Sequence, residues 1–345
     1  PEASKWTKNR AQEVQLKEIA KLKPQVEALI PSLKSCFLNP SSDVFARQAT
    51  YALLHRCAHA GIGLNAPLQD NIDSDAPYDL FAADRLVHFG KYTKAFPKVL
   101  RALDENDEIR VNHAARIVSD VITKSKKRWP PDKEPLPSLE DAVQPLAQQI
   151  QRLSPPQDSK SETLHQLVYS IGLIGKEIST GRYRSLHPHT TGPNKTLVSA
   201  LSRVVRNEAI HRSTRGKAAH WLGEMGAKEE LIQLVKLDNE SAKHALRPLS
   251  NRRQGVESAI APAIPRLIEI AGDETFGVTE RVQAINILSW SADDGVAAIP
   301  LLQKLSTKEA GADLTKGEEQ LRERARRAHL MIQRNRKKPV RGGQP

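Results

Sequence analysis

The chain has 345 residues, of which 39% are hydrophobic and only 4% aromatic, so its core must be built from Leu, Ile, Val and Ala. An all-β sandwich normally contains more aromatic residues, whereas such a core suits many small helix-to-helix contacts. The formal net charge of +12 indicates an acidic partner, nucleic acid or an anionic surface, and no stretch approaches the roughly 18 consecutive apolar residues that span a bilayer.

Pairs of apolar segments follow one another along the chain. In each pair, apolar residues recur at helical spacing, a polar turn interrupts them, and a second helical pattern begins. A separate helix is predicted at 78–90, and a short, degenerate unit at 228–250. The sequence therefore predicts an all-α fold of about six or seven helical hairpins, with four clearer pairs in 28–54, 95–121, 263–291 and 297–334 and two weaker copies in 142–175 and 196–226.

A proline and an arginine recur at fixed places in these hairpins. The proline removes one backbone hydrogen bond early in the first helix and bends it, as expected of a hairpin that curves around its neighbours. An Asp of the turn can cap the second helix, and the arginine can pair with carboxylates of its own turn or the adjacent one. These features predict packing and not catalysis. The recurring prolines are Pro31, Pro97, Pro265 and Pro300, and the recurring arginines are Arg47, Arg110 and Arg281.

In this pattern the chain resembles the HEAT-repeat family, in which paired helices stack into a superhelix. The resemblance extends over roughly 24–334 and is carried by Ile30-Pro31, Phe96-Pro97, Ile264-Pro265 and Ile299-Pro300, and by Val44/Arg47, Ile109/Arg110 and Val278/Arg281. It implies a single right-handed α-solenoid over 1–334. Family members act mostly as scaffolds and binding surfaces, and a minority resemble DNA repair glycosylases or bilin lyases, so the fold alone does not fix an activity.

Irregular segments interrupt the array. Three stretches rich in Pro, Gly or polar residues, 61–78, 125–139 and 177–194, are predicted to be loops because Pro and Gly do not continue helices. The basic tail 335–345 has little apolar content and is predicted to be disordered or to be a remnant of a longer chain. The chain begins at Pro1 without an apolar leader, as expected if a leader was removed or if the chain is a fragment.

Two pairs of histidines are spaced closely enough to be possible metal ligands. His55 and His59 are four residues apart and share a helix face, but the sequence offers no obvious third ligand, and Cys57 points the other way. His187 and His189 stand in a predicted loop without other good ligands nearby. The sequence therefore assigns no metal, no cofactor and no catalytic residue.

The two cysteines are predicted to be free thiols. In a helical hairpin Cys36 and Cys57 lie about 20 Å apart along the helix axes, whereas a disulfide needs Cα atoms within about 7 Å. Free thiols favour a reducing compartment such as the cytoplasm.

Basic residues form the candidate binding surface. Arginines on second helices of such arrays could line a positive groove that holds a phosphate backbone; the alternative is that they solvate the helices and pair with acidic residues. The predicted surface consists of Lys126, Lys127, Arg128, Arg203, Arg206, Arg212, Arg215, Lys217, Arg247, Arg252, Arg253, Arg322 and Arg326.

The sequence is consistent with three functions. The sequence favours a monomeric, non-catalytic scaffold whose curved surface holds an acidic protein or peptide. The first alternative is a nucleic-acid binder that uses the basic groove. The second is an enzyme acting on a flipped base beside Trp221, Trp290, Asp293 and Asp294, but Trp221 falls in the same register as the core position Ile287.

Overall fold

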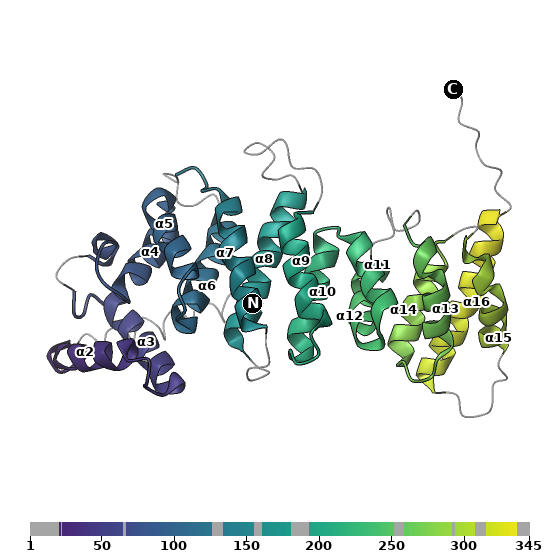
Figure 1. The fold of residues 1–345 in the computed structure, drawn as a ribbon, viewed down its shortest axis with the longest axis horizontal. Helices are drawn as coiled ribbons and strands as arrows, with labels where there is room; N and C mark the ends of the chain where they lie inside the picture. Colours follow the sequence, from purple (N-terminus) through teal and green to yellow (C-terminus); the bar gives the residue numbers. More distant parts are fainter. Residues whose placement is uncertain are drawn as a thin grey trace, which may run out of the picture. The chain divides into compact units, whose positions relative to one another are not determined.

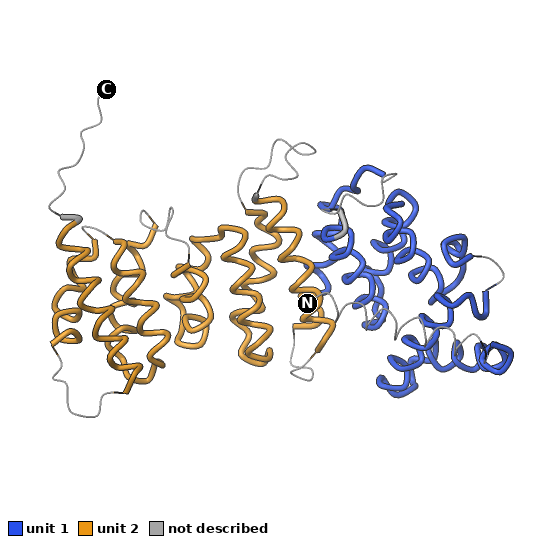
Figure 2. The backbone as a smooth tube through the Cα atoms, turned by 180° about the vertical axis from the view of Figure 1, so that it is seen from behind, with its two compact units in different colours: residues 1–149 blue, residues 150–345 orange. Residues whose placement is uncertain are grey.

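The computed structural model describes all but a few segments of the chain (Figure 1). It contains α-helices and short 3-10 helices and, within the residues it describes, no strands. The chain divides into two compact units, residues 1–149 and 150–345, and the boundary falls inside helix α7 (Figure 2). The described residues are 21, 23–64, 67–125, 134–154, 161–180, 193–251, 259–291, 294–307 and 315–336.

Unit 1 contains two packed groups of helices. Helix α2 packs against α3, and α4 packs against both α5 and α6, so the separate helix predicted at 78–90 is an integral part of the core. Asp43 and Asp107 cap α3 and α6 through their side chains, as predicted for the turn Asp. The elements are α2 (Lys23–Leu38), α3 (Val44–His59), η1 (Leu68–Asn71), α4 (Tyr78–His88), α5 (Tyr92–Leu103), α6 (Glu108–Ser125), η2 (Leu139–Ala142) and α7 (Val143–Leu153).

Aromatic rings build part of the core of unit 1. The Tyr51 ring lies 4.9 Å from the ring centroids of both Phe37 and Phe81, and Tyr78 packs on Phe81 at 5.8 Å. Cys57 is fully buried in this cluster, and both cysteines are free thiols. The expectation of a purely aliphatic core is therefore wrong here, because the few aromatic residues are concentrated in one place.

Unit 2 repeats one packing arrangement. Helices α8, α10, α12, α14 and α16 pack successively against one another, and each of the last four also packs on the helix that precedes it in the chain. The segment 228–250, predicted to be degenerate, forms a complete hairpin. The elements are α8 (Glu162–Thr180), α9 (Lys195–Arg206), α10 (Arg212–Glu224), α11 (Lys228–Leu237), α12 (Asn239–Ser250), η3 (Ala261–Ala263), α13 (Ile264–Gly272), α14 (Val278–Leu288), η4 (Asp294–Ala298), α15 (Ile299–Thr307) and α16 (Lys316–Arg336).

The recurring arginine has a common contact that the sequence did not predict. The Nε–H of Arg47 donates to the Phe37 carbonyl at 2.9 Å, and that of Arg215 donates to the Val205 carbonyl at the same distance. Arg281 donates to Ala271 at 3.1 Å, also ten residues back. Each arginine therefore satisfies a carbonyl at the C-terminal end of the first helix, where the helix itself offers no donor.

The recurring arginines of unit 1 also pair with carboxylates. Arg47 pairs with Asp107 of the following hairpin, and Arg110 pairs with Asp79 at 2.9 Å and Glu105 at 2.5 Å. The predicted pairing with carboxylates of the same or the adjacent turn is thus confirmed for unit 1.

Some predicted boundaries differ from the structure. Helix α8 continues to Thr180, so the loop predicted from residue 177 begins later, and α16 already begins at Lys316. The loop predicted at 61–78 contains the 3-10 helix η1, and most of the tail lies outside the described residues. None of the described helices is long and apolar enough to cross a membrane.

Candidate metal centre

Three potential metal ligands meet between helices α3 and α4. His55 and His59 lie one turn apart on α3, and Asp84 faces them from α4. The two His Nε2 atoms are 3.2 Å apart, and His55 Nε2 lies 3.4 Å from Asp84 Oδ2. One ligand atom from each residue lies within 4.8 Å of the others. Ligand atoms bound to one ion at about 2.0–2.2 Å lie roughly 3.0–3.5 Å apart, so two of these spacings already suit a metal ion.

The group has a packed side and an open side. The His55 ring packs edge-on against Phe81 at 4.8 Å and against His113 at 5.4 Å. The side chains of His55 and Asp84 are 24% and 14% exposed, whereas His59 is exposed to solvent. A ligand could therefore approach from the side of His59.

Two residues behind the group hold Asp84 in place. His113 on α6 lies with Nε2 3.5 Å from Asp84 Oδ2, and its Nδ1 is 2.5 Å from the Tyr51 hydroxyl. Because Asp84 can only accept when ionised, the Nε2–H of His113 faces it, and the Tyr51 hydroxyl donates to Nδ1. Outer partners of this kind fix the orientation of metal ligands.

The protonation states suit metal binding. Burial lowers the pKa of His113 to about 4, and burial together with the charge of His55 lowers that of His59 to about 4. Burial alone would raise the pKa of Asp84, but hydrogen bonds from His113 and His55 outweigh it and hold that pKa well below its usual range. At neutral pH His59 is therefore a neutral imidazole and Asp84 a carboxylate, the forms that bind metals.

Asp84 is the residue that sequence reasoning missed. The spacing of His55 and His59 is visible in the sequence, but the third ligand belongs to the helix predicted at 78–90 and reaches them only through the packing of α4 beside α3. His187 and His189 lie outside the described residues. No local motif marks Asp84, so the sequence carried no signal for it beyond its place in a helix.

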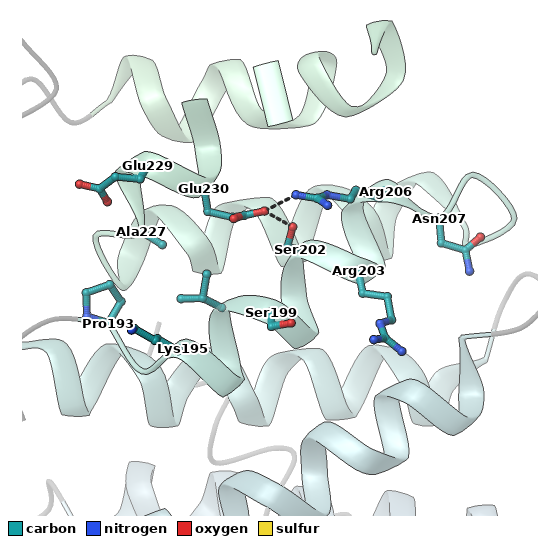
Figure 3. A pocket seen from close by; sticks show the side chains of 11 residues that line it. Pro193, Lys195, Ser199, Ser202, Arg203, Arg206, Asn207, Ala227, Glu229 and Glu230 are labelled. Atoms are coloured by element: carbon teal, nitrogen blue, oxygen red, sulfur yellow. Dashed lines mark hydrogen bonds and ion pairs between the residues drawn. The ribbon is translucent and has the colours of Figure 1, made fainter. Parts of the chain in front are cut away.

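The predicted basic surface is divided among several elements. Arg203 and Arg206 line a cavity of about 950 Å³ between α9 and α11. Arg206 pairs there with Glu230 at 2.7 Å, whereas Arg203 points away from Glu230 (Figure 3). Arg212, Lys217, Arg247, Arg322 and Arg326 lie on α10, α12 and α16, while Lys126, Lys127, Arg128, Arg252 and Arg253 lie outside the described residues.

Individual members of this surface have structural roles. Arg215 is only 4% exposed and donates to a carbonyl, so its inclusion in the surface is corrected. Arg322 donates from Nε to the Ser306 carbonyl at 3.1 Å, and the Lys217 ammonium lies 5.6 Å from the rings of Tyr169 and Trp221. For the remaining residues, binding of nucleic acid stays a prediction.

Trp221, the first tryptophan considered for an enzyme site, lies in the core of unit 2. Trp221 is 6% exposed and packs on Tyr169 at 5.7 Å, as predicted for a core position. Trp290 is partly buried, Asp294 lies in η4, and Asp293 is outside the described residues.

Comparison with known proteins gives only loose structural likenesses. No family model and no curated protein matches the chain. Human deoxyhypusine hydroxylase in complex with glycerol is similar to it at 14% identity and a TM-score of 0.29, over 91% of this chain and 99% of that one. An engineered protein is similar at 16% identity and a TM-score of 0.30, over 78% of this chain and 99% of that one.

These likenesses transfer no activity and no residue role to this chain. The prediction of a non-catalytic scaffold is nevertheless corrected, because it rested on the helical repeat pattern alone and did not include the three potential metal ligands that converge between α3 and α4. A helical repeat pattern therefore does not by itself imply a non-catalytic role, and the function must be argued from the residues of the site.

Proposed function

We propose that this protein binds a divalent transition-metal ion through His55, His59 and Asp84. The observation that carries the proposal is the convergence of two imidazoles and one carboxylate within 4.8 Å on two packed helices. Two His and one carboxylate are the ligand set of catalytic zinc sites and of non-haem iron sites, which keep further coordination positions open.

The surroundings support a reactive centre in preference to a closed structural one. A bound ion would supply a Lewis acid or an activated water at the solvent-facing side. His59 forms that side, and the rings of Phe81 and His113 close the other. His113 holds the carboxylate of Asp84, so the chain itself pre-orients one ligand before the ion arrives.

Metal titration of the full chain tests this proposal. After treatment with a chelator and dialysis, calorimetric titration with Zn²⁺, Mn²⁺ or Co²⁺ should show one ion per chain. We expect His59→Ala and Asp84→Asn to weaken binding by more than about 100-fold, beyond the 10–100-fold loss typical of an outer-shell partner.

His88→Ala is the matched control, because His88 is an exposed histidine of the neighbouring helix α4 and is not one of the three ligands. Binding that is equally tight in wild type, His59→Ala and Asp84→Asn would contradict the proposal. Circular dichroism of each variant checks that the helices are intact.

We also propose that the two units are HEAT-like repeats of one right-handed α-solenoid over residues 1–334. Support comes from the prolines inside α2 and α5 and at the start of α13. The identical arginine-to-carbonyl contact in three hairpins and the successive packing of the second helices in unit 2 support it further.

A further inference from the structure

A permanent cation lies beside the three candidate ligands. Arg116 on α6 lies with a guanidinium nitrogen 3.4 Å from Asp84 Oδ2, the oxygen that also faces His55 and His113. The Arg116 side chain is 52% exposed, whereas that of His113 is 4% exposed. Arg116 is therefore the partner of Asp84 that can turn away into solvent.

A metal ion and Arg116 compete for one carboxylate oxygen. An ion bound to Asp84 would carry twice the charge of the guanidinium and would repel it at such short range. Because Arg116 is held at the surface by a single long contact to Asp84, it can leave that oxygen without leaving the rim of the centre.

With an ion bound to the three ligands, the positive charge around the centre would exceed the negative charge. Asp84 is the one carboxylate among the three ligands, whereas a divalent ion carries two positive charges and Arg116 adds a third. The open side therefore favours a negatively charged ligand.

We infer that the centre takes a substrate bearing an oxyanion, a carboxylate or a phosphate-type group, which binds at the open side of the metal and pairs with Arg116. A planar guanidinium offers two parallel donors to such a group. This inference rests on the proposed metal centre and adds the chemical class of what binds to it.

Titration of the cobalt-loaded protein tests the inference. The visible absorption of bound Co²⁺ reports changes in its coordination, and phenylphosphonate and benzoate serve as the two oxyanion probes. We expect at least one probe to change the wild-type spectrum at a saturable concentration. Loss of a charge-assisted hydrogen bond predicts that Arg116→Gln weakens this binding by at least about tenfold, and Arg116→Lys should restore part of it.

The controls separate this inference from the metal proposal. Co²⁺ should bind Arg116→Gln at least as tightly as wild type, because a competitor for Asp84 has been removed. Arg101→Gln, at an exposed arginine of α5, should bind both Co²⁺ and the probe like wild type. Without Co²⁺ the probe should bind at least about tenfold more weakly, because the Arg116 guanidinium then remains paired with Asp84.

Each outcome has one meaning. Failure of Co²⁺ to bind the wild-type chain overturns both proposals. If Co²⁺ binds but neither probe does, or if Arg116→Gln binds the probe like wild type, the oxyanion inference is overturned and the metal centre stands. Binding of one probe alone supports the inference and identifies the substrate group as a carboxylate or as a phosphate-type group.

Discussion

At the scale of single residues, burial decides what a charged side chain does. Arg215 and Arg281 are among the most buried arginines described, and each donates to a helix-end carbonyl. Arg110 is equally buried but meets Asp79 and Glu105, whose hydrogen bonds outweigh the cost of burial and raise its pKa. The same position in the hairpin therefore serves either a backbone or a carboxylate partner.

His244 predicts a pH dependence of stability in unit 2. It is 9% exposed, and its Nε2 has no hydrogen-bond partner among the described residues. Burial and the charges of Arg215 and Arg212 lower its pKa to about 4, below the value of about 6.5 expected in the unfolded chain. The unfolded state therefore takes up a proton first, and the free energy of unfolding falls as the pH drops from 6.5 towards 4.

Urea unfolding at pH 7.5 and pH 5 measures this effect. The contribution of His244 to the difference between the two pH values is about 2 kcal/mol, so His244→Leu should reduce the pH-dependent loss of stability by about that amount. Contributions from His59 and His113 are the same in both proteins and cancel. Equal pH dependence in wild type and variant would contradict the expectation, and His165→Leu, at an exposed histidine of α8, is the control.

The candidate metal centre shows which part of the site could be predicted from the sequence and which part could not. The i, i+4 spacing of His55 and His59 is a property of one helix, so the sequence alone revealed it. Asp84, His113 and Tyr51 come from three different helices, and their meeting depends on how α3, α4 and α6 pack. Periodicity contains no information about that angle and spacing.

At the scale of elements, the helices themselves were predictable. Apolar spacing identified both helices of each clear hairpin, and the turn Asp residues capped as expected, because both effects are local. The segment 228–250 was underestimated, since its turn is a single residue, Asp238, which caps α12 directly after α11. Loop composition likewise could not show that α8 runs on to Thr180.

The contact between α8 and α10 depends on the absence of a side chain at Gly172. A Cβ added there would lie 2.0 Å from Cγ of Trp221, close to the fixed base of that ring. Because Tyr169 also packs on Trp221, the ring has little room to move. We expect Gly172→Ala to lower the free energy of unfolding by about 1–3 kcal/mol, despite the better helix propensity of Ala.

Gly216→Ala in α10 is the matched control for this change. Its added Cβ would meet only Nδ1 of His244, at an ordinary contact distance of 3.5 Å, so we expect it to be neutral or slightly stabilising. Replacing Trp221 by Leu in the Gly172→Ala background should recover part of the loss. A Gly172→Ala protein as stable as wild type in urea would show that α8 and α10 can separate at little cost.

At the scale of the whole molecule, the average composition did not show that the cores of the two units are built from different residues. The low aromatic content predicted an aliphatic core throughout, and the buried residues of unit 2 are indeed mostly Leu, Ile, Val and Ala. Unit 1 instead gathers Phe37, Tyr51, Tyr78 and Phe81 beside the candidate metal centre. An aromatic cluster fixes His55 and His113 more firmly than flexible aliphatic side chains would.

A single array over residues 1–334 makes a prediction about the size of the protein in solution. About seven hairpins stacked roughly 10 Å apart give a radius of gyration of about 23 Å, whereas a compact chain of this length has one of roughly 20 Å. Small-angle X-ray scattering distinguishes the two, and the mass from the same measurement tests the expected monomer. A value near 20 Å at monomer mass would contradict a single array over residues 1–334, because a stack of that many hairpins is longer than a compact chain.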